Sequence, residues 1–418
     1  MLLEGLLLVL LALLGVPLFV IIAAGAMLGF YSEHVDLSVL GIDFFGISET
    51  PVLVAIPLFT FAGFLLSEGR APQRLVRLSQ ALLGWLPGGL AMISLAICAL
   101  FTAFTGASGV TIIALGALLL PALDEAGYDG KFNLGLITTS GSLGLLFAPS
   151  LPLILYGVVA QTSIDHLFLA GVLPGLLMVA ALCVFSWWRN RHLRVQRAPA
   201  PGREVLGAIA GAKWELPLPI VVLGGIYSGY FAVSEAAAVT ALYVLVIELF
   251  VLHEIRWRAL PRIVRESMVL VGAIFVILGM SLASTNYLID MQIPQKLFGI
   301  ISTHVAGPKT FLLALLVFLL ILGAILDIFS AIVLVVPLIV PVALGYGIDP
   351  VHLGIVFLGA MELGYLTPPV GLNLFISSHR FGKDITEIYL ATVPFLLVLL
   401  VSVVVITYWP ALSLALVK

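Results

Sequence analysis

The chain has 418 residues, of which 62% are hydrophobic and 10% are charged, and its mean hydropathy is +1.22. A soluble domain carries roughly 45–50% apolar and about 25% charged residues, so this composition excludes a soluble protein and indicates an all-α polytopic membrane protein. The net charge of -3 excludes little, because charges in such a protein act by location. The two cysteines, Cys98 and Cys183, lie in apolar runs, which excludes a disulfide framework or a cysteine-based metal site.

Spanning helices need roughly 20 apolar residues, and nine segments meet that requirement. They are 5–29, 51–67, 132–159, 167–188, 214–230, 234–252, 268–288, 352–377 and 387–413. The first segment lacks the basic start of a signal peptide and is expected to remain as a helix. Two further apolar stretches, 88–123 and 308–343, are too long for one crossing and are interrupted near their middles. Each is expected to form a re-entrant hairpin.

The basic residues favour a cytoplasmic amino terminus and a periplasmic carboxyl terminus. If both hairpins return to the side from which they enter, 16 of the 19 Lys and Arg residues face the cytoplasm, as short cytoplasmic loops require. Only Lys296, Lys309 and Lys418 remain outside. Two segments with basic residues at helical spacing, 71–86 and 260–268, are expected to form amphipathic arms in the interface. An ordinary solvated loop is the alternative for each arm.

An internal repeat is visible at an offset of 220 residues. P-A-L-D-E-A-G-Y-D at 121–129 matches P-V-A-L-G-Y-G-I-D at 341–349, with Pro, Gly and Asp coinciding. Downstream, S-L-G-L-L-F-A-P-S at 142–150 matches E-L-G-Y-L-T-P-P at 362–369. Each half therefore contains a hairpin followed by a helix that Gly and Pro interrupt.

The expected topology inverts the two halves, because the first hairpin opens to the cytoplasm and the second to the outside. The first half is 1–193 with the broken helix 132–159, and the second half is 231–418 with the broken helix 352–377. Residues 194–230 form a linker and a connecting helix. Paired broken helices in an inverted repeat are typical of the midplane binding site of a secondary transporter.

Two kinds of residue carry the candidate chemistry. T-G-A-S-G-V-T at 105–111 offers carbonyl and hydroxyl oxygens for a hard monovalent cation, while helix N-termini suit an anion. A small-residue helix crossing is the alternative for this motif. Asp327 and Glu362 are carboxylates at membrane depth and are candidates for an ion or proton relay, the alternative being a structural hydrogen-bond acceptor.

The motifs of ATP-driven transport and of ordinary hydrolysis are missing from the sequence, which has no Walker motif, no H-E-x-x-H and no G-x-S-x-G elbow. The prediction is a secondary transporter and not an enzyme. Two alternatives stay open, a proton-coupled organic-anion carrier that uses Asp327 or Glu362, and an intramembrane enzyme. The second would need a catalytic partner for Asp327, and none is evident.

Six motifs in order along the chain carry a resemblance to a known family. They are P-G-G-L-A at 87–91, G-A-S-G-V-T at 106–111, G-S-L-G-L-L-F-A-P-S-L-P-L-I-L-Y-G at 141–157, L-F-L-A-G-V-L-P-G at 167–175, G-G-I-Y-S-G-Y-F-A-V-S-E-A-A-A at 224–238 and E-L-G-Y-L-T-P-P-V-G-L-N-L-F at 362–375. With these motifs, nearly the whole chain resembles the large membrane subunit of tripartite ATP-independent periplasmic (TRAP) transporters, the DctM-like family.

The resemblance implies an elevator-type carrier of the ion-transporter superfamily in a bacterial inner membrane. Such a carrier imports an organic acid, for example a dicarboxylate, together with sodium and without any other cofactor. It implies two partners, a periplasmic substrate-binding protein and a small four-helix membrane subunit. The small subunit is expected as a separate chain.

The resemblance also implies the site residues, several of which would contribute only backbone carbonyls. One sodium site would contain Thr105, Gly106, Ser108, Gly144, Phe147 and Pro149. The other would contain Gly323, Gly364, Thr367 and Val370. The expected substrate contacts are Ser108, Ser142, Ser150, Thr367 and Asn373.

Overall fold

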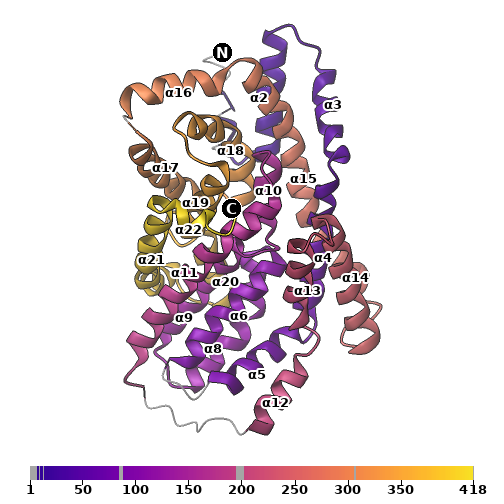
Figure 1. The fold of residues 1–418 in the computed structure, drawn as a ribbon, viewed down its shortest axis with the longest axis vertical. Coiled ribbons are helices and arrows are strands. Elements are labelled where there is room, and N and C mark those ends of the chain that lie inside the picture. The colour runs from indigo at the N-terminus through magenta and orange to yellow at the C-terminus, as the bar shows by residue number, and fades with distance from the viewer. Residues whose placement is uncertain are drawn as a thin grey trace.

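The computed structural model describes residues 7–417 except 9, 13, 84–87, 194–201 and 306. Its regular elements are helices, and no strand occurs among the described residues (Figure 1). By length and apolar composition, 6 helices can cross a membrane, or up to 9 if each bent helix pair is one span. This confirms the all-α polytopic fold. Parts of the expected segments 5–29, 71–86 and 87–91, and the start of the linker, lie outside the described residues.

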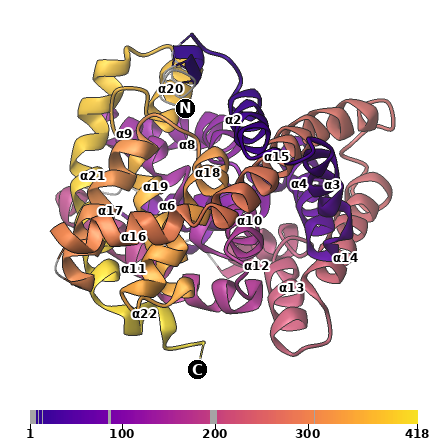
Figure 2. The ribbon, with the colours of Figure 1, turned by 90° about the horizontal axis from the view of Figure 1, so that it is seen from above.

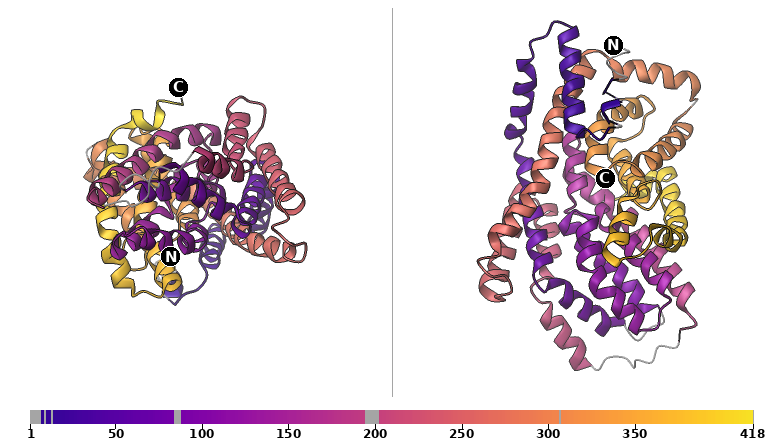
Figure 3. Two further views of the ribbon diagram at one scale, coloured as in Figure 1. Left: turned by 90° about the horizontal axis from the view of Figure 1, so that it is seen from below. Right: turned by 180° about the vertical axis from the view of Figure 1, so that it is seen from behind.

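Four helices form a group on one side of the molecule, which we call the scaffold. They are α2 (Leu18–Ser32), α4 (Ala55–Glu68), α14 (Val233–Val246) and α15 (Leu260–Asp290). Helix α4 packs along α14, and α15 packs along both α2 and α4. Figure 2 shows α3, α4, α13 and α14 on one side and α11, α19 and α21 on the other, and Figure 3 shows the same grouping from behind.

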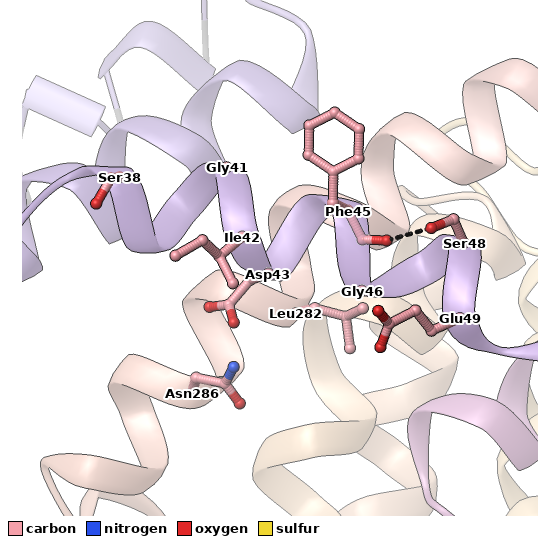
Figure 4. Close-up of a pocket in the computed structure, with 10 residues that line it drawn as sticks. All are labelled: Ser38, Gly41, Ile42, Asp43, Phe45, Gly46, Ser48, Glu49, Leu282 and Asn286. Carbon is pink, nitrogen blue, oxygen red and sulfur yellow. Dashed lines mark hydrogen bonds between the residues drawn. The ribbon is translucent and has the colours of Figure 1, made fainter.

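Helix α3 (Ser38–Gly46) runs beside α15 at the outer edge of the scaffold. The Phe44 ring packs against Gly279, where an added Cβ would lie 2.3 Å from a ring carbon. A cavity of about 830 Å³ lies between α3 and α15, with Asp43 and Asn286 on its facing walls (Figure 4). None of the expected transport-site residues lines this cavity.

The first hairpin consists of α6 (Gly89–Thr105), α7 (Ser108–Ala114) and α8 (Gly116–Glu125). The two ends of this hairpin lie close together, because the hydroxyl of Tyr128, which follows α8, lies against the backbone at the start of α6. The arm helix α5 (Ala71–Leu83) packs against both α6 and α8. Both ends of the hairpin therefore lie on the α5 side of the molecule, the lower end in Figure 1.

The second hairpin consists of α17 (Pro308–Gly323) and α18 (Ile328–Gly345), and its ends lie beside the arm helix α16 (Ile293–His304). Tyr346, directly after α18, donates to Val305 O at 3.0 Å and stacks on Phe311 of α17 at 4.9 Å. Helix α16 is at the end of the molecule opposite α5 (Figure 1). The two hairpins thus open toward opposite ends, as an inverted repeat requires.

The prediction of a separate interfacial arm at 260–268 is wrong. Residues 260–268 are the first turns of α15, one continuous helix of 31 residues. The helix does not break there because Ile263, Ser267 and Val271 continue on the same buried face into the spanning part. The second arm is α16 instead, which begins 222 residues after α5 and turns by 110° into α17.

Both expected broken helices are present. The first runs from α9 (Gly130–Ser140) through the 3-10 turn η3 (Leu143–Leu146) to α10 (Leu151–Val159), and the second from α19 (Pro350–Gly364) to α20 (Leu372–Phe381). Each break contains one cis X-Pro bond, Ala148–Pro149 and Pro368–Pro369. The remaining helices are η1 (Ile47–Glu49), η2 (Pro51–Val54), α11 (Ile164–Asn190), α12 (Gly202–Gly211), α13 (Pro217–Tyr227), the π-helical η4 (Ile247–Val251), α21 (Ile385–Tyr408) and α22 (Pro410–Leu414).

The sequence repeat at offset 220 is also a structural repeat. Asp129 and Asp349 each cap the helix that follows, the first accepting from Phe132 N at 3.2 Å and the second from Val351 N at 2.8 Å. Just before them, Gly127 and Gly347 have φ of 83° and 73°, a left-handed conformation that glycine adopts without strain. The same turn therefore joins hairpin to broken helix in both halves.

Candidate functional site

The first break lies directly against the first hairpin. Gly144 packs on α6 so closely that an added Cβ would lie 2.2 Å from Ala99 O and 2.5 Å from Ala103 N. The hairpin tip is equally close, since a Cβ on Gly106 would lie 2.3 Å from a side-chain carbon of Leu151, the residue after the break. Gly106 ends α6 with φ 64°, where glycine is the favoured residue. The tip and the break thus form one unit.

Thr102 joins the three segments of this first unit. Its hydroxyl donates to Gly141 O at 2.9 Å, and the Thr111 hydroxyl of α7 lies 2.6 Å from it. All three residues are buried. The two hydroxyls therefore hold both arms of the hairpin and the carboxyl end of α9 in register.

The expected residues of the first sodium site are brought together, with two different kinds of contribution. Thr105 and Ser108 are buried on either side of the hairpin tip, and the Thr105 hydroxyl lies 3.5 Å from Ala107 O. Phe147 points its ring at Gly175 of α11, where an added Cβ would lie 2.7 Å from the ring. Phe147 and Pro149 can therefore offer only carbonyl oxygens to a cation.

The second break repeats this arrangement against the second hairpin. A Cβ on Gly364 would lie 2.5 Å from Gly323 Cα and 2.6 Å from its carbonyl carbon. The amides of Val370 and Gly371 both donate to Ala324 O at 3.2 Å, which fastens the break to the hairpin tip. Thr367 donates to Leu363 O at 2.8 Å and to Gly364 O at 3.1 Å. All residues of the second expected sodium site therefore lie in one contact region.

Asp327 has a structural role in this contact. Its carboxylate accepts from the amides of Phe329 and Ser330 at 3.0 and 3.1 Å and from the Ser330 hydroxyl, and so caps α18. The amide of Ile328 donates to the Tyr365 hydroxyl at 2.7 Å. The tip of the second hairpin is thus held by its own cap and by the second broken helix.

Glu362 differs from Asp327. It is 0% exposed inside α19, and neither carboxyl oxygen has a hydrogen-bond partner among the described residues. A buried carboxylate without a partner is costly, so this side chain carries a proton or receives a cation or water. Of the two relay candidates, Glu362 is the one whose carboxyl is free.

The two broken helices meet through a buried polar cluster. Asn373 of α20 donates from Nδ2 to Thr138 O and to Ser142 Oγ, both at 3.2 Å. Thr138 in turn donates to Ser377 Oγ at 2.9 Å. Two expected substrate contacts, Ser142 and Asn373, therefore touch each other although they come from opposite halves of the chain.

Besides those of Glu362, three buried oxygens close in sequence to the two breaks have no hydrogen-bond partner among the described residues. They are Thr139 Oγ1, Ser150 Oγ and Asn373 Oδ1. The two hydroxyls can donate to a carboxylate, while the amide oxygen can only accept and suits a cation or water. A region with such unsatisfied oxygens, in which the backbone is also broken, has the chemistry of an ion and anion site.

The two breaks differ in accessibility. Ser150 in the first break is 0% exposed, whereas Val370 in the second break is 46% exposed. Pro368 and Pro369 are also exposed. The Pro368–Val370 segment of the second break is therefore exposed, whereas Ser150 in the first break is buried.

Three residues of the polar cluster and the first unit were not expected from the sequence. Thr102, Thr138 and Ser377 each make a buried hydrogen bond between segments. Thr102 lies three residues before the T-G-A-S-G-V-T motif, so helical spacing back from the hairpin tip could have indicated it. The Thr138–Ser377 pair joins two helices from different halves and has no local signal in the sequence.

Comparison with known proteins identifies the family. A family model described as the tripartite ATP-independent periplasmic transporter, DctM component, matches residues 5–412. The chain belongs to this family. It is 37% identical over 378 residues to the C4-dicarboxylate TRAP transporter large permease protein DctM of Pseudomonas aeruginosa, which covers 90% of this chain and 88% of that relative.

A second relative is a longer protein than this chain. The isethionate TRAP transporter permease protein DctMQ of Oleidesulfovibrio alaskensis is 34% identical over 377 residues, which cover 89% of this chain and 59% of that relative. The fold is similar to that in the crystal structure of the Alcanivorax borkumensis YdaH transporter, which has an unusual topology. The TM-score is 0.66 at 14% sequence identity, and the match covers 89% of this chain and 87% of that chain. The TRAP family confirms a multi-pass transporter permease and not an enzyme.

Proposed function

We propose that this TRAP large permease couples the import of an organic anion to sodium, with one sodium site in each break–hairpin unit. The observation that carries the proposal is the repeated contact of Gly144 with α6 and of Gly364 with Gly323. In both units the backbone breaks where it meets a hairpin tip, and carbonyl and hydroxyl oxygens gather there. Hard monovalent cations are bound by such oxygens at discontinuous helices.

The anion would dock between the two units, on free hydroxyls and at helix N-termini. Ser150, whose hydroxyl is free, is the N-cap of α10, Thr139 has a free hydroxyl at the end of α9, and Asn373 lies in the first turn of α20. Helix N-termini favour negative charge. Sodium in the two units would fix the hairpin tips and lower the local negative potential before the anion enters.

The relatives indicate a class of substrate and not a single compound. The two relatives described above are named for C4-dicarboxylates and for isethionate, which are small organic anions. For this chain we propose a carboxylate or a related anion. Transport would follow an elevator movement, in which the hairpins and broken helices slide as one body against the scaffold.

The partners and the orientation complete the proposal. A periplasmic binding protein would deliver the anion, and a small four-helix membrane subunit would brace the scaffold. The chain would lie in the bacterial inner membrane with its amino terminus in the cytoplasm and its carboxyl terminus in the periplasm. The inverted halves 1–193 and 231–418, linked by 194–230, would provide the two gates of alternating access.

Uptake in proteoliposomes tests the proposed function. They would contain this chain and its small subunit, with the binding protein and radiolabelled organic anions outside, with or without an inward sodium gradient. Accumulation is expected only when both sodium and the binding protein are present. Accumulation driven equally well by a proton gradient without sodium would reject sodium coupling.

Proton coupling is a second candidate, and the free, fully buried carboxyl of Glu362 favours it. In that case Glu362→Gln would remove the pH dependence of uptake and uncouple transport. Under sodium coupling the same variant would keep its sodium dependence, because Glu362 is not one of the proposed ligands.

A further inference from the structure

A buried cluster of charged side chains joins the arm α5 to the scaffold, far along the chain from either break. Arg74, in the first turn of α5, pairs with Glu215 through Nε at 2.7 Å and also forms an ion pair with Glu254. A third carboxylate, Glu248, lies 3.6 Å from Arg74 Nη2. Glu248 belongs to the π-helical end of α14, an irregularity that is frequent at functional sites.

Glu248 is the least satisfied member of the cluster. It is 1% exposed, and neither of its carboxyl oxygens has a hydrogen-bond partner among the described residues. Gly69 leaves the room for it, since an added Cβ there would lie 2.5 Å from Glu248 Oε2. Glu215 is 7% exposed, and its Oε2 also lacks a partner within the described part of the chain.

A cavity of about 10 Å³, the size of one small solvent molecule, borders both Glu215 and Glu248. Tyr243 and Trp214 also line it, but the Tyr243 hydroxyl already donates to Trp214 O at 2.9 Å. Both carboxylates therefore border a small, partly open pocket, and their free oxygens accept no hydrogen bond from the described residues that line it.

The charges in the cluster do not balance. Three carboxylates face one guanidinium, and the other nearby charged groups are engaged elsewhere or turned to solvent. Glu68 pairs with Arg262 at the surface, and Arg70 contributes its backbone amide to Glu254 at 2.6 Å while its side chain is exposed. An uncompensated buried carboxylate is strongly unfavourable, so the cluster must take up a cation.

The geometry of the cluster favours a proton over a metal ion. Among the described residues, no group of three or more His, Cys, Asp or Glu side chains is arranged to hold a metal ion. A proton needs no ligand cage, and it turns a carboxyl oxygen from an acceptor into a donor. It therefore removes one charge and supplies the donor that the cavity lacks.

We propose that Glu248 is a proton-binding site at the joint between the scaffold and arm α5. With Glu248 neutral, the Arg74 guanidinium is left to Glu215 and Glu254, which hold the first turn of α5 against the segment before α13 and the segment after η4. Loss of the proton adds a buried negative charge next to two others and loosens the joint. The site is separate from the two proposed sodium units and makes the stability of the arm sensitive to pH.

Thermal unfolding of the purified full-length chain in detergent, between pH 6 and pH 8.5 and with sodium constant, tests the proposal. The folded state holds a proton that the unfolded carboxyl loses, so the stability of wild type falls as pH rises. The folded-to-unfolded ratio should fall up to about tenfold per pH unit more steeply in wild type than in Glu248→Gln. At pH 8.5 the Tm of Glu248→Gln should exceed that of wild type.

Two further variants locate the proton. Glu266→Gln, at an exposed carboxylate that pairs with Arg262 at 3.4 Å, is the matched control and should keep the wild-type pH slope. Equal pH slopes in wild type and Glu248→Gln would overturn the proposal, as would a Glu215→Gln or Glu254→Gln variant that alone flattens the slope. Stabilisation by sodium that Glu248→Gln abolishes would show a metal cation in place of the proton. Because unfolding is measured, these outcomes do not depend on sodium-coupled transport.

Discussion

At the residue scale, glycines set the contact between broken helices and hairpins. Gly144 and Gly364 occupy equivalent positions 220 residues apart, and each faces backbone atoms of a hairpin helix at a distance that no Cβ tolerates. Backbone atoms cannot move aside as a flexible side chain can. These two glycines therefore let the carbonyl oxygens of the break and of the hairpin tip share one space.

Gly364→Ala tests this contact. The added methyl should push the break away from Gly323 and lower the free energy of unfolding by about 1–3 kcal/mol. Sodium-driven uptake should fall at least tenfold, because the oxygens around the break are displaced. Gly272→Ala is the control, since nothing lies within 4 Å of its added Cβ and its helix should gain stability slightly. Normal uptake by Gly364→Ala would contradict the close contact.

Asp327 gives a second prediction at this scale. Asparagine caps helices about as well as aspartate, so Asp327→Asn should keep both uptake and thermal stability, whereas Asp327→Ala should lose about 1 kcal/mol. Uptake and unfolding of the two variants would be compared over the same pH range. If Asp327→Asn abolished uptake while the protein stayed folded, the charge itself would be needed and the cap would not explain the residue.

At the element scale, the first unit is held together by hydroxyls that bridge separate segments. Thr102→Val should leave Gly141 O and the Thr111 hydroxyl without their partner and destabilise the protein by about 1–3 kcal/mol. It should also raise the sodium concentration needed for half-maximal uptake. Thr240→Val is a matched control, because the buried Thr240 hydroxyl donates only within its own helix, to Ala236 O at 2.7 Å. Equal effects of the two variants would reject a bridging role.

The helices also show how much of the fold can be predicted from the sequence. Hydropathy and the Gly/Pro breaks predicted both hairpins and both broken helices, because each leaves a local signal. The offset of 220 predicted their pairing, and applied to the arm 71–86 it would have indicated α16. The arm at 260–268 was wrong because basic residues can sit on a continuing helix as well as on a separate one. Contacts such as Thr138–Ser377 depend on how distant helices pack and leave no local trace.

At the scale of the whole molecule, the scaffold touches both hairpins. Gly63 of α4 lies against the tip of the first, where an added Cβ would be 2.6 Å from Thr105 Cα. Ser281 of α15 donates to Val333 O of the second hairpin at 2.7 Å. An elevator movement has to break both contacts, while a fixed pore or a gate confined to one hairpin tip leaves at least one intact.

Cross-linking tests the movement. With Cys98 and Cys183 replaced by Ala, Ser281→Cys and Val333→Cys would be joined by a short bifunctional thiol reagent. Uptake should fall to background after cross-linking and return when a cleavable linker is reduced. Each single cysteine treated in the same way should remain active. Full uptake by the cross-linked protein would exclude sliding of the second hairpin along α15.

The most direct test of the central claim is equilibrium binding of radioactive sodium to the purified chain. Wild type should show saturable binding at two sites, and Gly144→Ala and Gly364→Ala should each remove one site while Gly272→Ala keeps both. Absence of saturable binding in folded wild type, or two unchanged sites in both break variants, would contradict a sodium site in each break–hairpin unit.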